Sequence, residues 1–202
     1  MLLVLDVKIN YILNLVINTM SVCKDCALRL YNTKSYNLQG IGNPFSGNCI
    51  VVPNVDYKAY KGKSMSFSSQ VEIIKDVLLL STGVEESDFY ILPLIRCNEQ
   101  ISCKLDRMTY NKCLHWFAND IRKYDFKNIL LLGNAARRFL NCNVTEYLDT
   151  VMISSNGRKY FVNYAPLVKY YDDKLFETFK DKLIHWHKCV TTNMYDYNIL
   201  RL

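Results

Sequence analysis

The amino-acid sequence predicts an α/β fold, a three-layer sandwich in which helices cover both faces of a mostly parallel four-stranded sheet. Short apolar runs bounded by turn residues alternate with segments of helical periodicity, the pattern of a parallel sheet. No linker or internal repeat divides the 202 residues, a length that suits one hydrophobic core. Half of the residues are apolar and 22% are charged, which excludes a disordered chain.

Four apolar runs predict the strands. The first, Cys49–Val52, and the second, Asp88–Ile95, are rich in branched or aromatic side chains and are bounded by turn residues. Asn128–Leu132 and Lys159–Val162 complete the set. Parallel sheets of this kind bind ligands at the carboxyl ends of their strands. The loops after Val52, Ile95, Leu132 and Val162 are therefore expected to form one functional rim.

Four segments between and after these runs predict helices. They are Val71–Leu80, which stops near Gly83, Tyr110–Tyr124, Ala135–Leu140 and Asp172–His187. Cys113, Phe117 and Ile121 recur on one stripe of the second helix, the spacing of an amphipathic helix that packs against a sheet.

The termini lie outside this core. Residues 1–20 predict an amphipathic helical extension, with an upstream start codon before Met20 as the alternative. Asp6 and Lys8 interrupt its apolar character, so it is neither a signal peptide nor a membrane span. We expect no membrane partner and an intracellular location, cytoplasmic or nuclear. The domain is predicted over residues 21–190, followed by a tail at 191–202.

The eight cysteines suggest a metal site, because clustered cysteines in a reducing compartment more often bind metal than form disulfides. Cys23 and Cys26 form a C-x2-C pair. Cys97 lies just past a predicted strand, and Cys113 lies in the following helix. Four thiolates suit a 4Fe–4S cluster or a structural zinc, and the spacing does not separate the two. Cys103 is the substitute should Cys97 not be a ligand.

Charge gives a weaker indication of a partner. The net charge of +6 favours a polyanion such as DNA, although the basic residues form no dense run. Basic residues near the expected rim are Lys58, Lys61, Lys63, Arg137 and Arg138. The last two could contact phosphate or simply face solvent. His185 and His187 alternate on a helix and so face different sides, which favours packing roles over a second metal site.

In its motifs the chain resembles the family-4 uracil-DNA glycosylases, the iron–sulfur branch of that superfamily, from about Cys23 to Trp186. Its opening, Cys23-x2-Cys26-Ala27-Leu28, is like the family's C-x2-C-x-L, and Leu38–Gly42 is like its V-x-G-x-G. Ile95-Arg96-Cys97 is like the strand end of T-N-x-x-K-C, Leu132–Ala136 is like L-G-x-x-A, and Ala165-Pro166 stands in place of H-P. The resemblance implies the glycosylase fold, and it favours a 4Fe–4S cluster on Cys23, Cys26, Cys97 and Cys113 over zinc.

The catalytic motifs depart from the family. Val52 stands where the family motif G-E-x-P-G has its carboxylate, Pro93 where an asparagine reads uracil, and Ala165 where a histidine precedes proline. Removing these three polar groups should lower the rate of base excision by several powers of ten. Phe67 could still stack on a base. Asp56 could replace the carboxylate from a shifted loop, and Tyr164 could replace the histidine as a hydrogen-bond donor.

The leading hypothesis is therefore a catalytically degenerate member of the family that binds DNA or a replication or transcription protein. One alternative is an active, divergent DNA glycosylase that uses Asp56, Phe67 and Tyr164. Another is a zinc-stabilised structural or assembly subunit with no nucleic-acid role. Frequent Asn and Tyr suggest an AT-rich genome such as that of a virus or phage.

Overall fold

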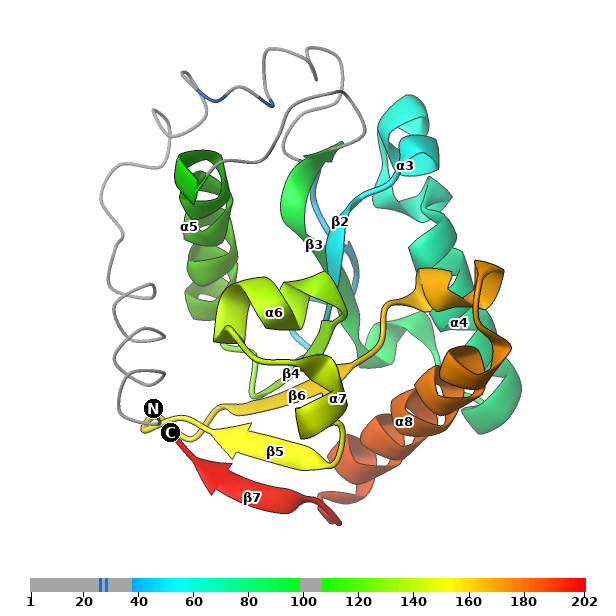
Figure 1. Ribbon diagram of the computed structural model, residues 1–202, viewed down its shortest axis with the longest axis vertical. Coiled ribbons are helices and arrows are strands. Elements are labelled where there is room, and N and C mark those ends of the chain that lie inside the picture. The colour runs from blue at the N-terminus through cyan, green and yellow to red at the C-terminus, as the bar shows by residue number, and fades with distance from the viewer. Residues whose placement is uncertain (1–25, 27, 29–37, 99–106) are drawn as a thin grey trace.

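The computed structural model describes Cys26, Leu28 and the ranges 38–98 and 107–202 (Figure 1). The extension predicted for residues 1–20 lies outside the described residues, as do Cys23 and Cys103. The described chain is an α/β fold, which confirms the predicted class. None of its described helices is long and apolar enough to cross a membrane.

One mixed sheet forms the centre of the described chain, with the strand order β1-β3-β2-β4-β6-β5-β7. The strands are β1 (Ile41–Gly42), β2 (Asn48–Val55), β3 (Tyr90–Asn98), β4 (Asn128–Leu132), β5 (Thr150–Ile153), β6 (Lys159–Asn163) and β7 (Asn198–Arg201). The four strands at the predicted positions, β3, β2, β4 and β6, are adjacent and parallel. In this block Val51 lies between Leu92 on one neighbour and Leu131 on the other.

The predicted four-stranded sheet was too narrow, because the described sheet has seven strands. Strands β1 and β5 pair antiparallel with β3 and β6, and β7 pairs in parallel with β5. Residues 191–202 were expected to be a tail after the domain. Instead they include the end of the last helix and β7, the edge strand beyond β5.

Helices flank this sheet on both faces. They are α3 (Tyr57–Gly62), α4 (Ser69–Thr82), α5 (Arg107–Tyr124), α6 (Asn134–Leu140), α7 (Val144–Tyr147) and α8 (Asp173–Thr192). Three short 3-10 helices are η1 (Met65–Phe67), η2 (Glu86–Asp88) and η3 (Pro166–Tyr170). As predicted, α4 stops at Gly83, whose φ of 66° closes the helix in the left-handed conformation. Helix α8 continues past the predicted end at His187.

Alternating strand residues divide the core into two layers. In β2, Cys49 and Val51 join the cluster under α5 and α6, whereas Ile50 and Val52 join the cluster under α4 and α8. The other central strands alternate in the same way, as expected for strands buried on both faces. Figure 1 shows α5 and α6 on one side of the sheet and α3, α4 and α8 on the other.

The loops after β4 and β6 meet at the carboxyl end of the sheet. Gly133 follows β4 with φ 50° and ψ −122°, and its N–H donates to the Asn163 carbonyl at 2.7 Å. A Cβ on Gly133 would lie 2.7 Å from the Cβ of Ala165, so only glycine allows this approach. The carboxyl end of β3 and the segments after β2, β4 and β6 therefore share one edge of the sheet, which we call the rim.

Candidate metal centre and nucleic-acid interface

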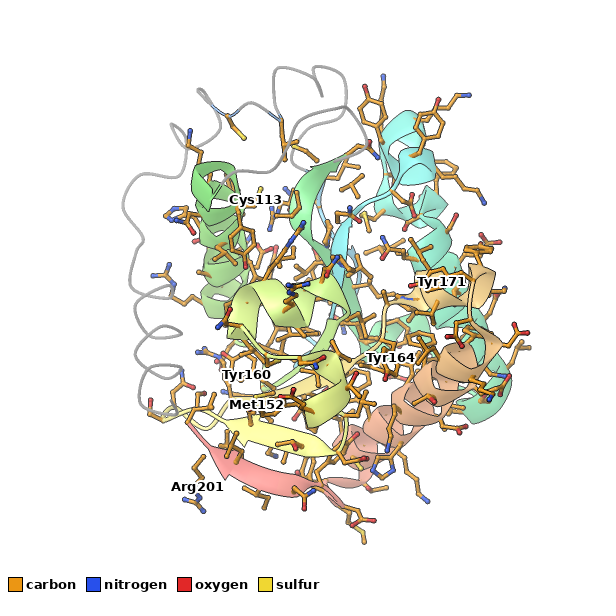
Figure 2. The ribbon with its side chains drawn as sticks, viewed as in Figure 1. Cys113, Met152, Tyr160, Tyr164, Tyr171 and Arg201 are labelled. Carbon is orange, nitrogen blue, oxygen red and sulfur yellow. The ribbon has the colours of Figure 1, made fainter. Side chains whose placement is uncertain are left out.

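Three of the four predicted metal ligands lie in one buried cluster. Cys26, Cys97 and Cys113 belong to one small buried cluster with Leu28 and Ile95, separate from the two main layers. Each cysteine is only 4–6% exposed. Cys97 comes from the carboxyl end of β3, and Cys113, labelled in Figure 2, comes from α5. Segments far apart in the sequence thus bring thiols into one apolar site, which we call the cysteine centre.

By residue type, the described thiols are donors that a thiolate-bound metal uses. Sulfur ligands in an apolar, solvent-screened site suit iron–sulfur clusters and structural zinc alike. Within the described residues, however, no group of three or more His, Cys, Asp or Glu side chains is arranged to hold a metal ion. Cys23, the fourth predicted ligand, and Cys103, the predicted substitute, both lie outside the described residues.

A buried ion pair joins the two elements that carry Cys97 and Cys113. Arg96 of β3 pairs with Asp120 of α5, and their side chains are 4% and 9% exposed. The Arg96 guanidinium carbon also lies 5.4 Å from the centre of the Trp116 ring. Burial raises the pKa of Asp120, and the neighbouring guanidinium opposes that rise. The pair fixes β3 against α5 directly beside the cysteine centre.

Apolar side chains occupy the positions where the family resemblance places catalytic groups. Val52 is fully buried, and its partner across the β2–β3 pair is the buried Pro93. Ala165 is half-buried after β6. Phe67, the predicted stacking residue, is 57% exposed on η1 and lies against Gly62. The first three positions supply no side-chain hydrogen bond to a base or a water molecule.

Asp56, the proposed substitute carboxylate, is engaged in holding helix ends. One oxygen accepts the Ala59 N–H at 2.9 Å and caps α3. The other accepts the Ser68 hydroxyl at 2.7 Å and the Gln70 N–H at 3.4 Å, at the start of α4. These bonds use both oxygens and point the carboxylate at the backbone rather than at a ligand, which favours a structural role.

A depression of about 640 Å³ lies at the carboxyl ends of β4 and β6. Its lining comes from the starts of α6 and α7, from η3 and from α8: Gly133, Asn134, Arg137, Asn141, Cys142, Asn143, Val144, Thr145, Tyr164, Ala165, Val168, Tyr171 and Leu175. Burial raises the pKa of the Cys142 thiol to about 11, so this sulfur is a neutral thiol at neutral pH.

The depression differs from the pocket that the sequence predicted. We expected Val52, Pro53, Phe67, Pro93, Ala165 and Pro166 to line one hollow, and only Ala165 lines this one. Four of the others are buried inside the fold and Phe67 lies on η1, so the expected set does not surround it. Tyr164, the proposed substitute donor, does line it, with its hydroxyl 3.5 Å from the Thr145 hydroxyl.

The predicted DNA-contacting residues divide into two groups. Lys58, Lys61 and Lys63 are exposed on α3 and at its carboxyl end, at the rim. Arg137 is exposed and lines the depression, whereas Arg138 is half-buried, with its guanidinium 6.0 Å from the Tyr110 ring centre. Successive residues of a helix point about 100° apart, so the two arginines serve different surfaces.

Sequence reasoning missed the polar and aromatic residues of the depression. Asn134, Asn141, Asn143 and Tyr171 line it, and none was named as a candidate. Asn134 and Tyr171 both come after predicted strands, at the rim, and this position in the sequence could have identified them as candidates. His185 and His187 were expected on different sides of α8. His185 contacts Cys189, with Nε2 3.6 Å from Sγ, while His187 is buried.

No protein-family model and no curated protein matches this chain.

Proposed function

We propose that this chain is a catalytically degenerate relative of the iron–sulfur uracil-DNA glycosylases that binds DNA at the rim. In this proposal Cys23, Cys26, Cys97 and Cys113 hold a 4Fe–4S cluster. The presence of Cys26, Cys97 and Cys113 in one buried cluster supports the metal site. The parallel order β3-β2-β4-β6 supports the same relationship, because it brings the predicted motifs to one edge of the sheet.

One observation carries the proposed loss of catalysis. Val52 and Pro93 are cross-strand partners with buried, apolar side chains, and the carboxylate of Asp56 is fully engaged at two helix ends. Base excision needs a group that activates water and groups that stabilise the leaving base. The described residues at these positions provide neither, so binding is the activity that the rim supports.

The metal is tested on protein purified without oxygen. An absorbance band at about 400 nm, lost in Cys113→Ser, is expected for the cluster. Cys142→Ser is the matched control, because Cys142 is equally buried but lies at the depression. Stoichiometric zinc without the band would establish the zinc-stabilised alternative. A protein that holds neither metal would exclude both centres.

The activity is tested by incubating the same protein with uracil-containing single-stranded and duplex DNA. We expect no released uracil, together with DNA binding whose affinity falls as salt rises. Uracil release that is abolished by Asp56→Asn would instead establish the divergent glycosylase. If no DNA is bound at any salt concentration, the rim is better explained as the docking surface for a replication or transcription protein.

A further inference from the structure

The chemistry of the depression fits one nucleotide. Its volume of about 640 Å³ falls within the usual range for small-ligand sites. The lining combines a guanidinium from Arg137, side-chain amides, tyrosine hydroxyls and rings, and apolar groups from Val168 and Leu175. Such a mixture can bind a phosphate, hydrogen-bond a base edge and cover a base face.

The charge around the depression favours an anion. No acidic residue is among those that line it, and Arg137 forms no ion pair within the described chain. Two nearby carboxylates are bonded elsewhere and do not pair with Arg137: Asp172 accepts the Leu175 N–H at 3.0 Å, and Glu146 accepts the Asn143 side-chain amide at 3.2 Å. Arg137 is therefore available to a phosphate.

One aromatic ring of the depression, and a second ring beside it, are exposed to solvent. Tyr171 is 71% exposed and its neighbour Tyr170 is 64% exposed, and both follow the exposed Lys169 of η3. Figure 2 shows Tyr164 and Tyr171 well away from Arg201 at the β7 edge. Exposed rings beside cations are the usual components of single-strand binding surfaces, where bases stack on the rings and lysines contact phosphates.

The same composition continues along the rim. Helix α3 begins directly after β2, and η3 follows β6, two strands away and therefore about 10 Å along the rim. Tyr57 and Phe67 are 55% and 57% exposed there, beside Lys61 and Lys63. Because the faces of paired bases are covered within a duplex, such rings can stack only on unpaired bases.

We propose that the depression holds one unpaired nucleotide of a single-stranded DNA, with its base against Tyr171 and its phosphate on Arg137. The strand continues past η3 toward the rings and lysines of α3 and η1. This inference rests on the DNA binding of the proposed function and adds the form of the DNA and the place of one nucleotide. The site lies beside the degenerate catalytic positions, with which it shares only Ala165.

The experiment measures fluorescence anisotropy of a labelled oligothymidine of about 12 nucleotides, within the usual site size of such proteins. The same sequence is also offered as a duplex and as an oligouridine. Tyr171→Ala and Arg137→Gln test the depression. Phe45→Ala and Arg201→Gln are their controls, because Phe45 is 78% exposed before the amino end of β2, and Arg201 is exposed on β7.

We expect the single strand to bind at least about tenfold more tightly than the duplex. Tyr171→Ala should weaken binding of the single strand about tenfold. Arg137→Gln should weaken binding and reduce the salt slope by about 0.7, the value for one phosphate on a single strand. The two controls should bind like the unsubstituted protein. Circular dichroism of each variant shows whether the fold is intact.

Equal binding of single strand and duplex, unchanged by Tyr171→Ala and Arg137→Gln, would overturn this inference and leave the proposed DNA binding standing. Tighter binding of the oligouridine would overturn the assignment to DNA. No binding of any probe would reject the inference together with the DNA-binding part of the proposed function, while the absorbance test of the cluster would still stand by itself.

Discussion

Replacing Asp120 by alanine tests whether the ion pair with Arg96 holds the cysteine-bearing elements together. The two side chains lie between β3 and α5 and are 9% and 4% exposed. In the variant the guanidinium stays buried beside Trp116, without the carboxylate that pairs with it. A buried charge that loses its partner is costly, because solvent cannot replace the lost interaction.

The expected cost follows from this geometry. Removing one partner of a buried ion pair destabilises a protein by about 3–5 kcal/mol. The Trp116 ring, 5.4 Å from the guanidinium carbon, retains a favourable contact with the cation, so we expect about 3 kcal/mol. Urea unfolding followed by circular dichroism should show a midpoint lower by about 1 M, if the unfolding free energy falls by about 3 kcal/mol per molar urea.

Two further variants make the comparison specific. Asp149→Ala removes an exposed carboxylate that pairs with Lys182, and it should cost less than about 1 kcal/mol. The double change Arg96→Met with Asp120→Leu removes both charges and should recover most of the loss. If Asp120→Ala is no more destabilising than Asp149→Ala, the ion pair does not hold β3 against α5 and this reasoning is wrong.

Three other predictions concern single positions. Asp56→Ala should destabilise the fold by about 1–2 kcal/mol in urea unfolding, because it removes the α3 cap and the anchor of Ser68; an unchanged midpoint would contradict the capping role. Gly133→Ala should lower the free energy of unfolding by about 1–3 kcal/mol, because φ is 50° at this position and a Cβ would contact Ala165. The loss should be larger than in Gly157→Ala, where φ is 80° but a Cβ meets open space. Burial lowers the pKa of His187, so as the pH falls below about 6.5 the unfolded chain binds a proton at this imidazole before the folded chain does, and the free energy of unfolding should fall. His187→Leu should lessen that loss of stability between about pH 6.5 and 5. An identical dependence of stability on pH in the variant and the unsubstituted protein would refute this prediction.

The central strands were predictable because their signal is local. In β4, Asn128–Leu132, an unbroken apolar run ends at Gly133, and burial on both faces requires such a run. The edge strands lack this signal. In β7 the residues Asn198, Ile199 and Arg201 are exposed, and its place in the sheet depends on pairing with β5. Pairing between distant segments leaves little trace in a short sequence window.

The candidate site was predictable in part for a similar reason. A cysteine is a candidate metal ligand by residue type alone, and Cys26, Cys97 and Cys113 do lie in one buried cluster. The shape of the hollow at the rim depends on how the loops fold. Asp56 looked like a free carboxylate in the sequence, yet Ser68 and the α3 backbone engage both of its oxygens. Side-chain partners of this kind follow from tertiary structure, which spacing alone does not give.

The cysteine centre and the rim are mechanically connected at the end of β3. Cys97 lies at the carboxyl end of that strand, on the edge where the rim begins, because the four central strands run in parallel. The next residue, Asn98, is buried and donates its side-chain amide to the Val55 carbonyl at 3.1 Å. Val55 ends β2 directly before Asp56, which caps α3 and so sets the position of Lys61 and Lys63. A metal held at the cysteine centre would therefore also fix the platform that carries these lysines, and in this way the proposed cluster would support the proposed DNA binding.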